Sequence, residues 1–268
     1  MIRVSEPSPD SFIVEASLER PPSIYLDHDS FDELVRRDPL RDRFLNAFRS
    51  KGTLLFSWTH VLDLSSAQGR TADLLRSFLE SIGPFWIPLE MNPFQMLRKE
   101  HGIGAENSSP CVSETLLRAY YPYIHGGPLT LAKIIDLNAT DRDAVQHELA
   151  RLKTEITAMI ERWRAEYVAD PARLDRMFPR LPFDAAKPGT FVFRELGRIA
   201  TREARSHAWQ PNDAVDFVHA IVAAAYARFV ALDRHWKRRV LETGLPPDHV
   251  SVYYKPELDS FIGDFEHL

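Results

Sequence analysis

Short apolar runs alternate with amphipathic stretches over the first 90 residues of the chain. Runs with the length of buried strands lie at 24–26, 53–57 and 84–90. Apolar residues recur at helical spacing in three stretches: 31–48 (one helix, or two broken near Pro39), 58–68 (with Ser57 as N-cap) and 71–83 (ended by Gly83). This alternation predicts an α/β domain with a parallel sheet.

The middle of the chain has a different pattern, and the alternation then returns. Residues 92–210 are mostly helical or irregular, with a long helix over 142–168 and a proline-rich loop over 177–189. After Pro211 we expect a buried helix at 212–228, strands at 229–232 and 250–254, a helix at 234–244 and a terminal helix. The sequence therefore predicts an N-terminal arm or edge strand (1–23), one sheet-containing domain (24–91 with 211–268) and a helical insertion (92–210).

Composition narrows the class of protein. The 268 residues are 44% hydrophobic and 26% charged with a net charge of −5, which is ordinary for a soluble globular protein and not that of a strongly basic nucleic-acid binder. The single cysteine, Cys111, excludes an internal disulfide and has no partners for a zinc site. Since there is no signal-peptide pattern and no uncharged run of transmembrane length, we expect a cytoplasmic protein.

Acidic residues recur where the expected strands end. Asp27 follows the strand at 24–26, and Asp233 follows the strand at 229–232. Asp63 lies on the helix after the second strand, and Asp216 on the first turn of the buried helix. Ligands of open α/β sheets bind beyond the carboxyl ends of the strands, so these acids are expected to converge. Because crowded carboxylates repel each other, the pattern favours a bound Mg²⁺ or Mn²⁺ ion.

The segments "IYLDHDSF", "WTHVLDL" and "DFVHAIVAAAYARFVALDRHW" resemble those of the PIN-domain nucleases. The resemblance covers about 24–90 and 212–255, and it implies a three-layer α/β/α domain. It also implies that Asp27, Asp63, Asp216 and Asp233 are the catalytic metal ligands of a metal-dependent endoribonuclease. Members of this family usually cut single-stranded RNA, many bacterial members are toxins held by an inhibitory protein, and dimers are common.

The resemblance has departures, and several residues stand in a second tier. The family usually has Glu where this chain has Asp63, with Glu90 as the competing candidate, and Thr where it has Ala231. Asp29, Asp213 and His219 are the other second-tier residues, with His219 expected to support a ligand. The basic residues His235, Lys237 and Arg238 either contact phosphate or form a solvated helix face.

Structural roles compete with the functional ones. Asp27 and Asp29 fit caps of the helix that begins near Ser30, Asp233 fits the cap of the next helix, and Asp63 fits a solvated position. Asp216 fits a capping-box variant with Asp213. The tryptophans Trp58, Trp86 and Trp236 are expected in the core rather than as base-stacking platforms.

Two other functions compete with the nuclease. A haloacid-dehalogenase-type phosphatase would use Asp27 as nucleophile, Asp29 as general acid and Ser57 at the next strand end. The expected late acidic pair of that family is missing. The second is a catalytically degenerate module of the same fold that binds RNA or protein, which the changes at Asp63 and Ala231 favour.

Overall fold

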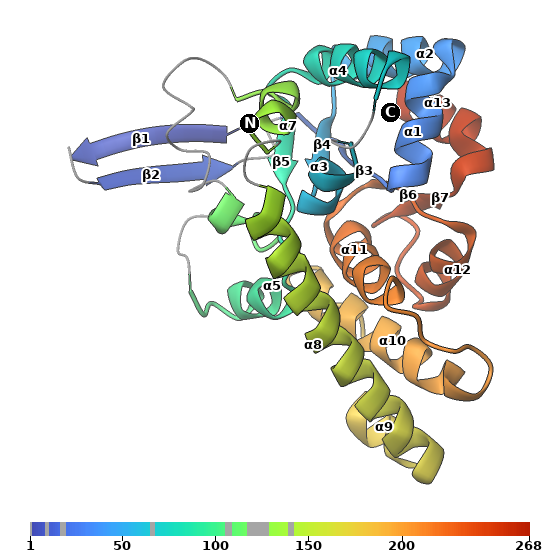
Figure 1. The fold of residues 1–268 in the computed structure, drawn as a ribbon. Coiled ribbons are helices and arrows are strands. Elements are labelled where there is room, and N and C mark those ends of the chain that lie inside the picture. Colours follow the sequence, from blue (N-terminus) through green and yellow to red (C-terminus); the bar gives the residue numbers. More distant parts are fainter. Residues whose placement is uncertain are drawn as a thin grey trace.

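A five-stranded, all-parallel sheet lies at the centre of the protein (Figure 1). The structure is a computed structural model that describes residues 2–8, 11–16, 20–64, 68–104, 109–116, 129–138 and 142–268. The strands are β3 (Ser23–Leu26), β4 (Thr53–Phe56), β5 (Trp86–Pro88), β6 (Phe229–Ala231) and β7 (Ser251–Tyr253). Their order across the sheet is β5-β4-β3-β6-β7. The α/β class and the parallel sheet predicted from the sequence are confirmed.

Helices cover both faces of this sheet. Alternate residues of each strand point to opposite faces, so one strand contributes to the apolar cluster on either side. Ile24 and Leu26 of β3 belong to one apolar cluster, while Tyr25 between them belongs to the other. The first cluster is completed by α1 (His28–Arg36), α2 (Asp38–Phe48), α3 (Trp58–Leu64), α4 (Arg70–Ile82), α7 (Leu131–Asn138) and α13 (Leu258–Glu266). The second is completed by α5 (Pro93–Glu100), α8 (Arg142–Ala169), α10 (Pro188–Arg202), α11 (Asp213–Tyr226) and α12 (Arg234–Glu242).

The expected elements agree with the structure except at their ends. The stretch 31–48 forms two helices, which meet at Arg37 before Pro39. Gly83 ends α4 with a φ of 63°, which a glycine adopts without strain. The last part of the helix expected at 58–68 includes residues 65–67, which lie outside the described residues. The short helices α9 (Arg173–Met177), η1 (Glu203–Arg205) and η2 (Lys255–Glu257) complete the set described here.

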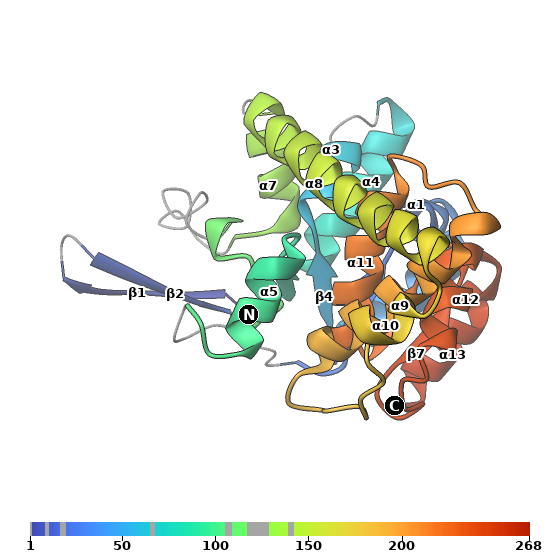
Figure 2. The same cartoon turned by 90° about the horizontal axis from the view of Figure 1, so that it is seen from below.

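The insertion is part of the core rather than a separate lobe. Ile156 and Ile160 of α8 and Val192 and Leu196 of α10 are buried in the same cluster as Tyr25 of the central strand. Figure 2 shows α8 crossing over α11 and α10, and both pairs are in contact. The second face of the sheet is therefore covered largely by residues from 92–210.

The N-terminal segment forms a hairpin instead of joining the central sheet. β1 (Ile2–Ser8) and β2 (Ser11–Ala16) pair with each other as a separate antiparallel two-stranded sheet. The hairpin projects from the body of the molecule (Figure 1). No helix among the described residues is long and apolar enough to cross a membrane.

Candidate functional site

One cavity of about 410 Å³ collects the acids at the carboxyl edge of the sheet. It is lined by Asp29 and by the four aspartates expected as metal ligands, which are Asp27, Asp63, Asp216 and Asp233. They come from the end of β3, from α3, from the first turn of α11 and from the end of β6. The structure therefore brings together residues from three distant parts of the sequence, and it does so at the edge where the sequence predicted them.

The strand order explains why the cavity forms at this point. The chain passes from β3 to β4 on one side and from β6 to β7 on the other, so β3 and β6 flank the place where the winding direction reverses. Helices diverge at such a switch point and leave a crevice beyond the strand ends. The two strands pair from Ile24 with Phe229 to Leu26 with Ala231, and the amide of Asp27 continues the ladder to Ala231 (2.9 Å).

Asp27 and Asp233 both cap a helix as well as lining the cavity. Asp27 Oδ1 accepts a hydrogen bond from the Ser30 amide at 2.8 Å. Asp233 Oδ1 accepts hydrogen bonds from the amides of His235 (2.6 Å) and Trp236 (2.9 Å). In each carboxylate one oxygen makes the cap, and the other oxygen takes no part in it. The capping role predicted as an alternative is therefore compatible with a place in the site.

The pKa values in the cavity show that its charges are poorly satisfied. Burial, together with repulsion from Asp233 and Asp29, raises the pKa of Asp27 to about 6. Burial and repulsion from Asp233, Asp213 and Asp27 raise the pKa of Asp216 to about 7. Burial also raises the pKa of Asp63, against the opposing charges of His28 and Lys153. Two carboxyl groups are thus poised to change charge near neutral pH, and a cation in the cavity would favour their ionised forms.

The donor set suits a hard divalent cation, but the side chains do not form a closed ligand set as they stand. Carboxylate oxygens are the ligands that Mg²⁺ and Mn²⁺ prefer. Among the described residues, no group of three or more His, Cys, Asp or Glu side chains lies together in a way that could hold a metal ion. The fit to a metal therefore rests on the chemistry and the raised pKa values of the acids, and not on preformed coordination.

The insertion contributes a cation that the sequence analysis did not single out. Lys153 and Leu149 of α8 line the acid cavity, and Lys153 Nζ donates a hydrogen bond to Asn212 Oδ1 at 3.3 Å. His28 also lines it, with Nδ1 at 3.9 Å from Asp63 Oδ2. Lys153 lies on the predicted helix at 142–168, but only the packing of α8 against α11 shows that this part of it meets the acids.

A buried polar network lies behind the cavity. Thr59 of α3 lines the cavity, and its hydroxyl lies 2.8 Å from His219 Nε2 and 2.8 Å from the hydroxyl of Ser57. The Ser57 hydroxyl lies 2.9 Å from His60 Nδ1, and His60 Nε2 donates to the carbonyl of Leu26 (2.8 Å). Burial lowers the pKa of His60 to about 4 and holds that of His219 well below its ordinary value, so both rings are neutral. The network ties α3 and α11 to the residue before Asp27.

The ring of His219, which was expected to support a metal ligand, lies within hydrogen-bonding distance of the hydroxyls of Thr59 and Ser57, and its role toward a ligand stays a prediction. Asp216 instead accepts a hydrogen bond from the side chain of Trp236. The capping-box alternative for Asp216 is wrong, because Asp213 is the first residue of α11 and the N-cap is Asn212, which makes no side-chain cap. Asp213 Oδ2 accepts from the Gln210 amide (2.8 Å) and contacts His207 (3.0 Å).

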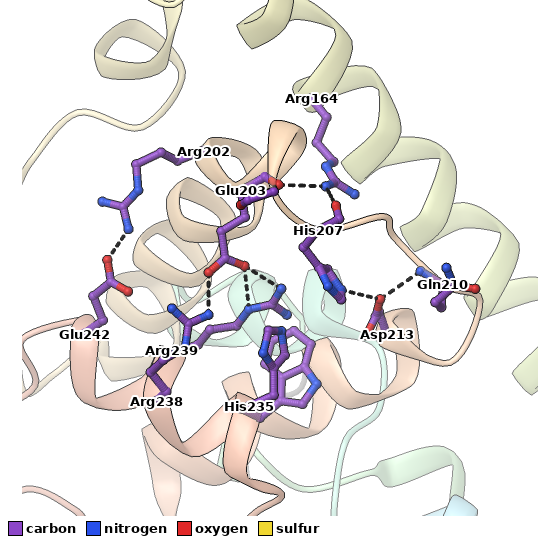
Figure 3. Close-up of polar contacts among 12 residues, drawn as sticks. Arg164, Arg202, Glu203, His207, Gln210, Asp213, His235, Arg238, Arg239 and Glu242 are labelled. Atoms are coloured by element: carbon purple, nitrogen blue, oxygen red, sulfur yellow. Dashed lines mark hydrogen bonds and ion pairs between the residues drawn. The ribbon is translucent and has the colours of Figure 1, made fainter.

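The basic residues proposed for phosphate contact are engaged elsewhere. Lys237 pairs with Glu257, and Arg238 pairs with Glu203 at 2.6 Å. His235 stacks near His207 at 4.9 Å between ring centroids. None of the three lines the acid cavity. Figure 3 shows that the carboxylate of Glu203 pairs with both Arg238 and Arg239.

Glu90, the competitor of Asp63, lies in a neighbouring cavity and not with the acids. Trp86 and Trp236 are buried as predicted, while Trp58 is only partly buried and lines the same neighbouring cavity. Cys111 is fully buried, and burial raises the pKa of its thiol to about 11, so it is not a reactive thiolate. Neither a family model nor a curated protein nor a solved structure matches this chain.

Proposed function

We propose that this protein is a metal-dependent endoribonuclease of the PIN-like type, which hydrolyses phosphodiester bonds of single-stranded RNA at the acid cavity. The observation that carries the proposal is the convergence of Asp27, Asp63, Asp216 and Asp233 on one cavity at the switch point of a parallel sheet. The raised pKa values of Asp27 and Asp216 support it, since they are what uncompensated metal ligands would have.

The shape of the surface around the acids supports a chain-like substrate. A cavity of about 400 Å³ shares Thr59 and Leu149 with the acid cavity. Another of about 260 Å³ shares His28 and Asp63 with it. The acid cavity therefore shares lining residues with two further cavities. A single strand of nucleic acid is long enough to occupy several such cavities at once.

Each group has a defined task in the proposed reaction. The four aspartates would hold one or two Mg²⁺ or Mn²⁺ ions, which supply positive charge to the reacting phosphate and lower the pKa of water. Lys153 supplies a further positive charge at the edge of the cavity. Thr59, held by His219, fixes the wall of the cavity between α3 and α11.

The deciding experiment is cleavage of a mixed-sequence single-stranded RNA with Mn²⁺, with Mg²⁺ and with EDTA. We expect cutting that needs the metal, and a loss of at least 100-fold in rate for Asp27→Asn, because one ligand and its charge are removed. Asp42→Asn is the matched control, since Asp42 is an exposed aspartate on α2 outside the cavity. Both variants must show the wild-type circular dichroism spectrum.

Two outcomes would contradict the proposal. If the folded protein cuts no RNA with either metal, the degenerate binding module becomes the better explanation. Cutting that persists in Asp27→Asn would move the reaction away from this cavity. The phosphatase alternative is disfavoured by a specific observation, because Ser57 is fully buried and hydrogen bonded to His60, so its hydroxyl is not accessible to a phosphate.

A further inference from the structure

The cavity next to the acids has the size and the walls of a base-binding site. Its volume is about 400 Å³, within the range of pockets that hold small organic ligands. It meets the acid cavity at Thr59 and Leu149, so a nucleotide bound in it is adjacent to the phosphate at the acids. Trp58, Met91 and Leu152 supply aromatic and apolar surface on its walls. A base has two flat apolar faces that such walls can cover.

The polar side chains of this cavity are arranged around a lysine. Lys99 Nζ lies 3.7 Å from Glu90 Oε2 and 3.7 Å from Glu114 Oε1, and it donates a hydrogen bond to the carbonyl of Val112 at 2.7 Å. The side chains of Lys99 and Glu90 are only 9% and 12% exposed. One Glu90 oxygen also accepts from the Asn92 amide at 3.0 Å, which fixes the carboxylate. The group is therefore held in place before any ligand arrives.

The charge of this group excludes a phosphate and favours the edge of a base. Two carboxylates and one ammonium carry a net negative charge, which repels phosphate oxygens. A carboxylate accepts hydrogen bonds at several lone-pair positions, and an ammonium donates three. Each carboxylate therefore offers two neighbouring acceptor oxygens next to a donor on Lys99.

We propose that this second cavity is a base-recognition subsite that takes a guanine of the single-stranded RNA, next to the phosphodiester held at the acid cavity. This inference rests on the proposed function and names the nucleotide that the same site selects.

The Watson–Crick edge of guanine matches the cavity best among the four bases. It presents one acceptor, O6, beside two donors, N1–H and the N2 amino group. Lys99 donates to O6, and the carboxylate of Glu90 or Glu114 accepts from N1–H and N2 together. Uracil offers one donor flanked by two carbonyls, and cytosine and adenine present ring acceptors beside a single amino group. Those three bases lack two adjacent donors on this edge, so none of them can occupy both oxygens of one carboxylate.

The test measures binding of nucleosides, which carry no phosphate to be repelled by the metal-free acids, to the wild-type protein in EDTA. Guanosine is expected to quench tryptophan fluorescence and to bind about tenfold tighter than adenosine, cytidine and uridine, as one bidentate base contact provides. Trp58→Phe should remove most of the quenching, because Trp58 lines the cavity.

Substitutions in the cavity separate base recognition from general binding. Glu90→Gln is expected to reduce the preference for guanosine to about twofold, while its amide oxygen keeps the hydrogen bond from Asn92. Glu114→Gln provides the same test if Glu90→Gln does not fold. Glu161→Gln is the matched control, because Glu161 does not line the cavity and its side chain is 54% exposed, and its preference should stay that of the wild type.

Equal binding of the four nucleosides, or no binding of any at millimolar concentration, overturns the subsite. So does a wild-type preference in both Glu90→Gln and Glu114→Gln. These results are independent of the nuclease assay: selective guanosine binding without RNA cleavage would keep the subsite and reject the nuclease. Cleavage without base preference would do the reverse.

Discussion

At the scale of single residues, the aspartates of the cavity carry two roles at once. Asp27 and Asp233 end their strands as helix caps, a role that a solvated loop acid could also fill. Asp27 differs from such an acid because burial and repulsion raise its pKa to about 6, and the same causes raise the pKa of the neighbouring Asp216 to about 7. The hydrogen bond of the cap favours the ionised form of Asp27, but burial and crowding outweigh it, so both side chains are costly to keep ionised in the absence of a cation.

This cost sets the pH dependence of stability in the metal-free protein. The folded-state pKa values of Asp27 and Asp216 lie above the ordinary value of 3.8, so the folded state binds more protons than the unfolded state between about pH 4 and pH 7. The stabilisation is complete below pH 4 and is lost as the pH rises through 6 and 7. The buried His60 and His219, which are neutral in the folded state, act in the opposite sense, so the effect is measured against Asp216→Asn, which shares both histidines. In EDTA we expect the Tm of the wild type to fall by about 5 °C relative to that of Asp216→Asn between pH 5 and pH 8.

Calorimetry of three proteins checks this expectation. Asp216→Asn is the reference, because it lacks the group with the higher pKa, whereas Asp42→Asn should show the same pH dependence as the wild type. Millimolar Mg²⁺ should restore Tm at pH 8 and have little effect at pH 5, because a ligand raises stability only where it binds. A Tm difference between the wild type and Asp216→Asn that stays constant from pH 5 to pH 8 in EDTA would contradict the raised pKa of Asp216.

At the scale of elements, the long helix α8 joins the insertion to the site. Its apolar side packs in the core with Ile156 and Ile160, and Lys153 on the same helix reaches the acid cavity. The helical spacing over 142–168 predicted the existence of α8, but not that Lys153 would lie at the acid cavity beside Asn212. That placement depends on the packing of α8 against α11, which no pattern within either segment encodes.

Removal of the Lys153 charge should weaken RNA binding more than it affects the fold. For Lys153→Gln we expect about a tenfold lower kcat/KM and a salt dependence of RNA binding whose slope falls by about one, as for the loss of one phosphate contact. Arg162→Gln is the matched control. Arg162 is exposed, and since it follows Lys153 by nine residues on α8, it lies on the opposite face of the helix. An unchanged salt slope in Lys153→Gln would exclude the phosphate contact.

A buried ion pair and hydrogen bonds from Arg164 hold α12 and the loop before α11 in place. The Arg239 side chain is 1% exposed and is paired with Glu203 Oε2 at 2.6 Å, while the guanidinium also lies 4.4 Å from the centroid of Trp236. Arg164 donates to the carbonyls of Glu203 and His207, which fixes the start of the same loop (Figure 3). Burial opposes the charge of Glu203, but hydrogen bonds from Arg238 and Arg239 outweigh it and hold its pKa below the ordinary value.

Breaking this pair should cost far more than breaking a pair at the surface. For Glu203→Gln we expect a loss of about 3 kcal/mol in the free energy of unfolding, because a buried guanidinium loses its counter-charge. Glu242→Gln removes an ion pair with Arg202 whose members are 35% and 43% exposed, and it should cost less than about 1 kcal/mol. Urea unfolding of the two variants measures the difference, and equal losses would contradict the buried role of Glu203.

At the scale of the whole molecule, the sequence predicted the sheet, its helices and the edge at which the acids meet. Short apolar strands and long amphipathic helices carry that information in their own residues. The sequence did not show that residues 92–210 belong to the core, because the apolar side of a helix does not reveal its partner. Nor did it show that Lys237 pairs with Glu257 and Arg238 with Glu203. Both acids lie on other elements of the structure.

The shared core gives a direct test of whether the insertion is dispensable. Replacing residues 92–210 with a short Gly/Ser linker should leave a chain that does not fold, because one face of the sheet would lose α5, α8 and α10. Circular dichroism and a thermal scan are sufficient: we expect no cooperative transition. A cooperative transition in the shortened protein would show that 24–91 and 211–268 form an independent domain.

The central place of β6 in the sheet has a consequence for the time at which activity arises. Asp27 emerges early from the ribosome, but its neighbour β6 is made some 200 residues later, and β3 cannot pair with it before then. Pairing over so long a separation is slow, because the whole intervening chain must be ordered to close the loop. For the proposed nuclease this means that the acid cavity cannot form until almost the whole messenger has been translated.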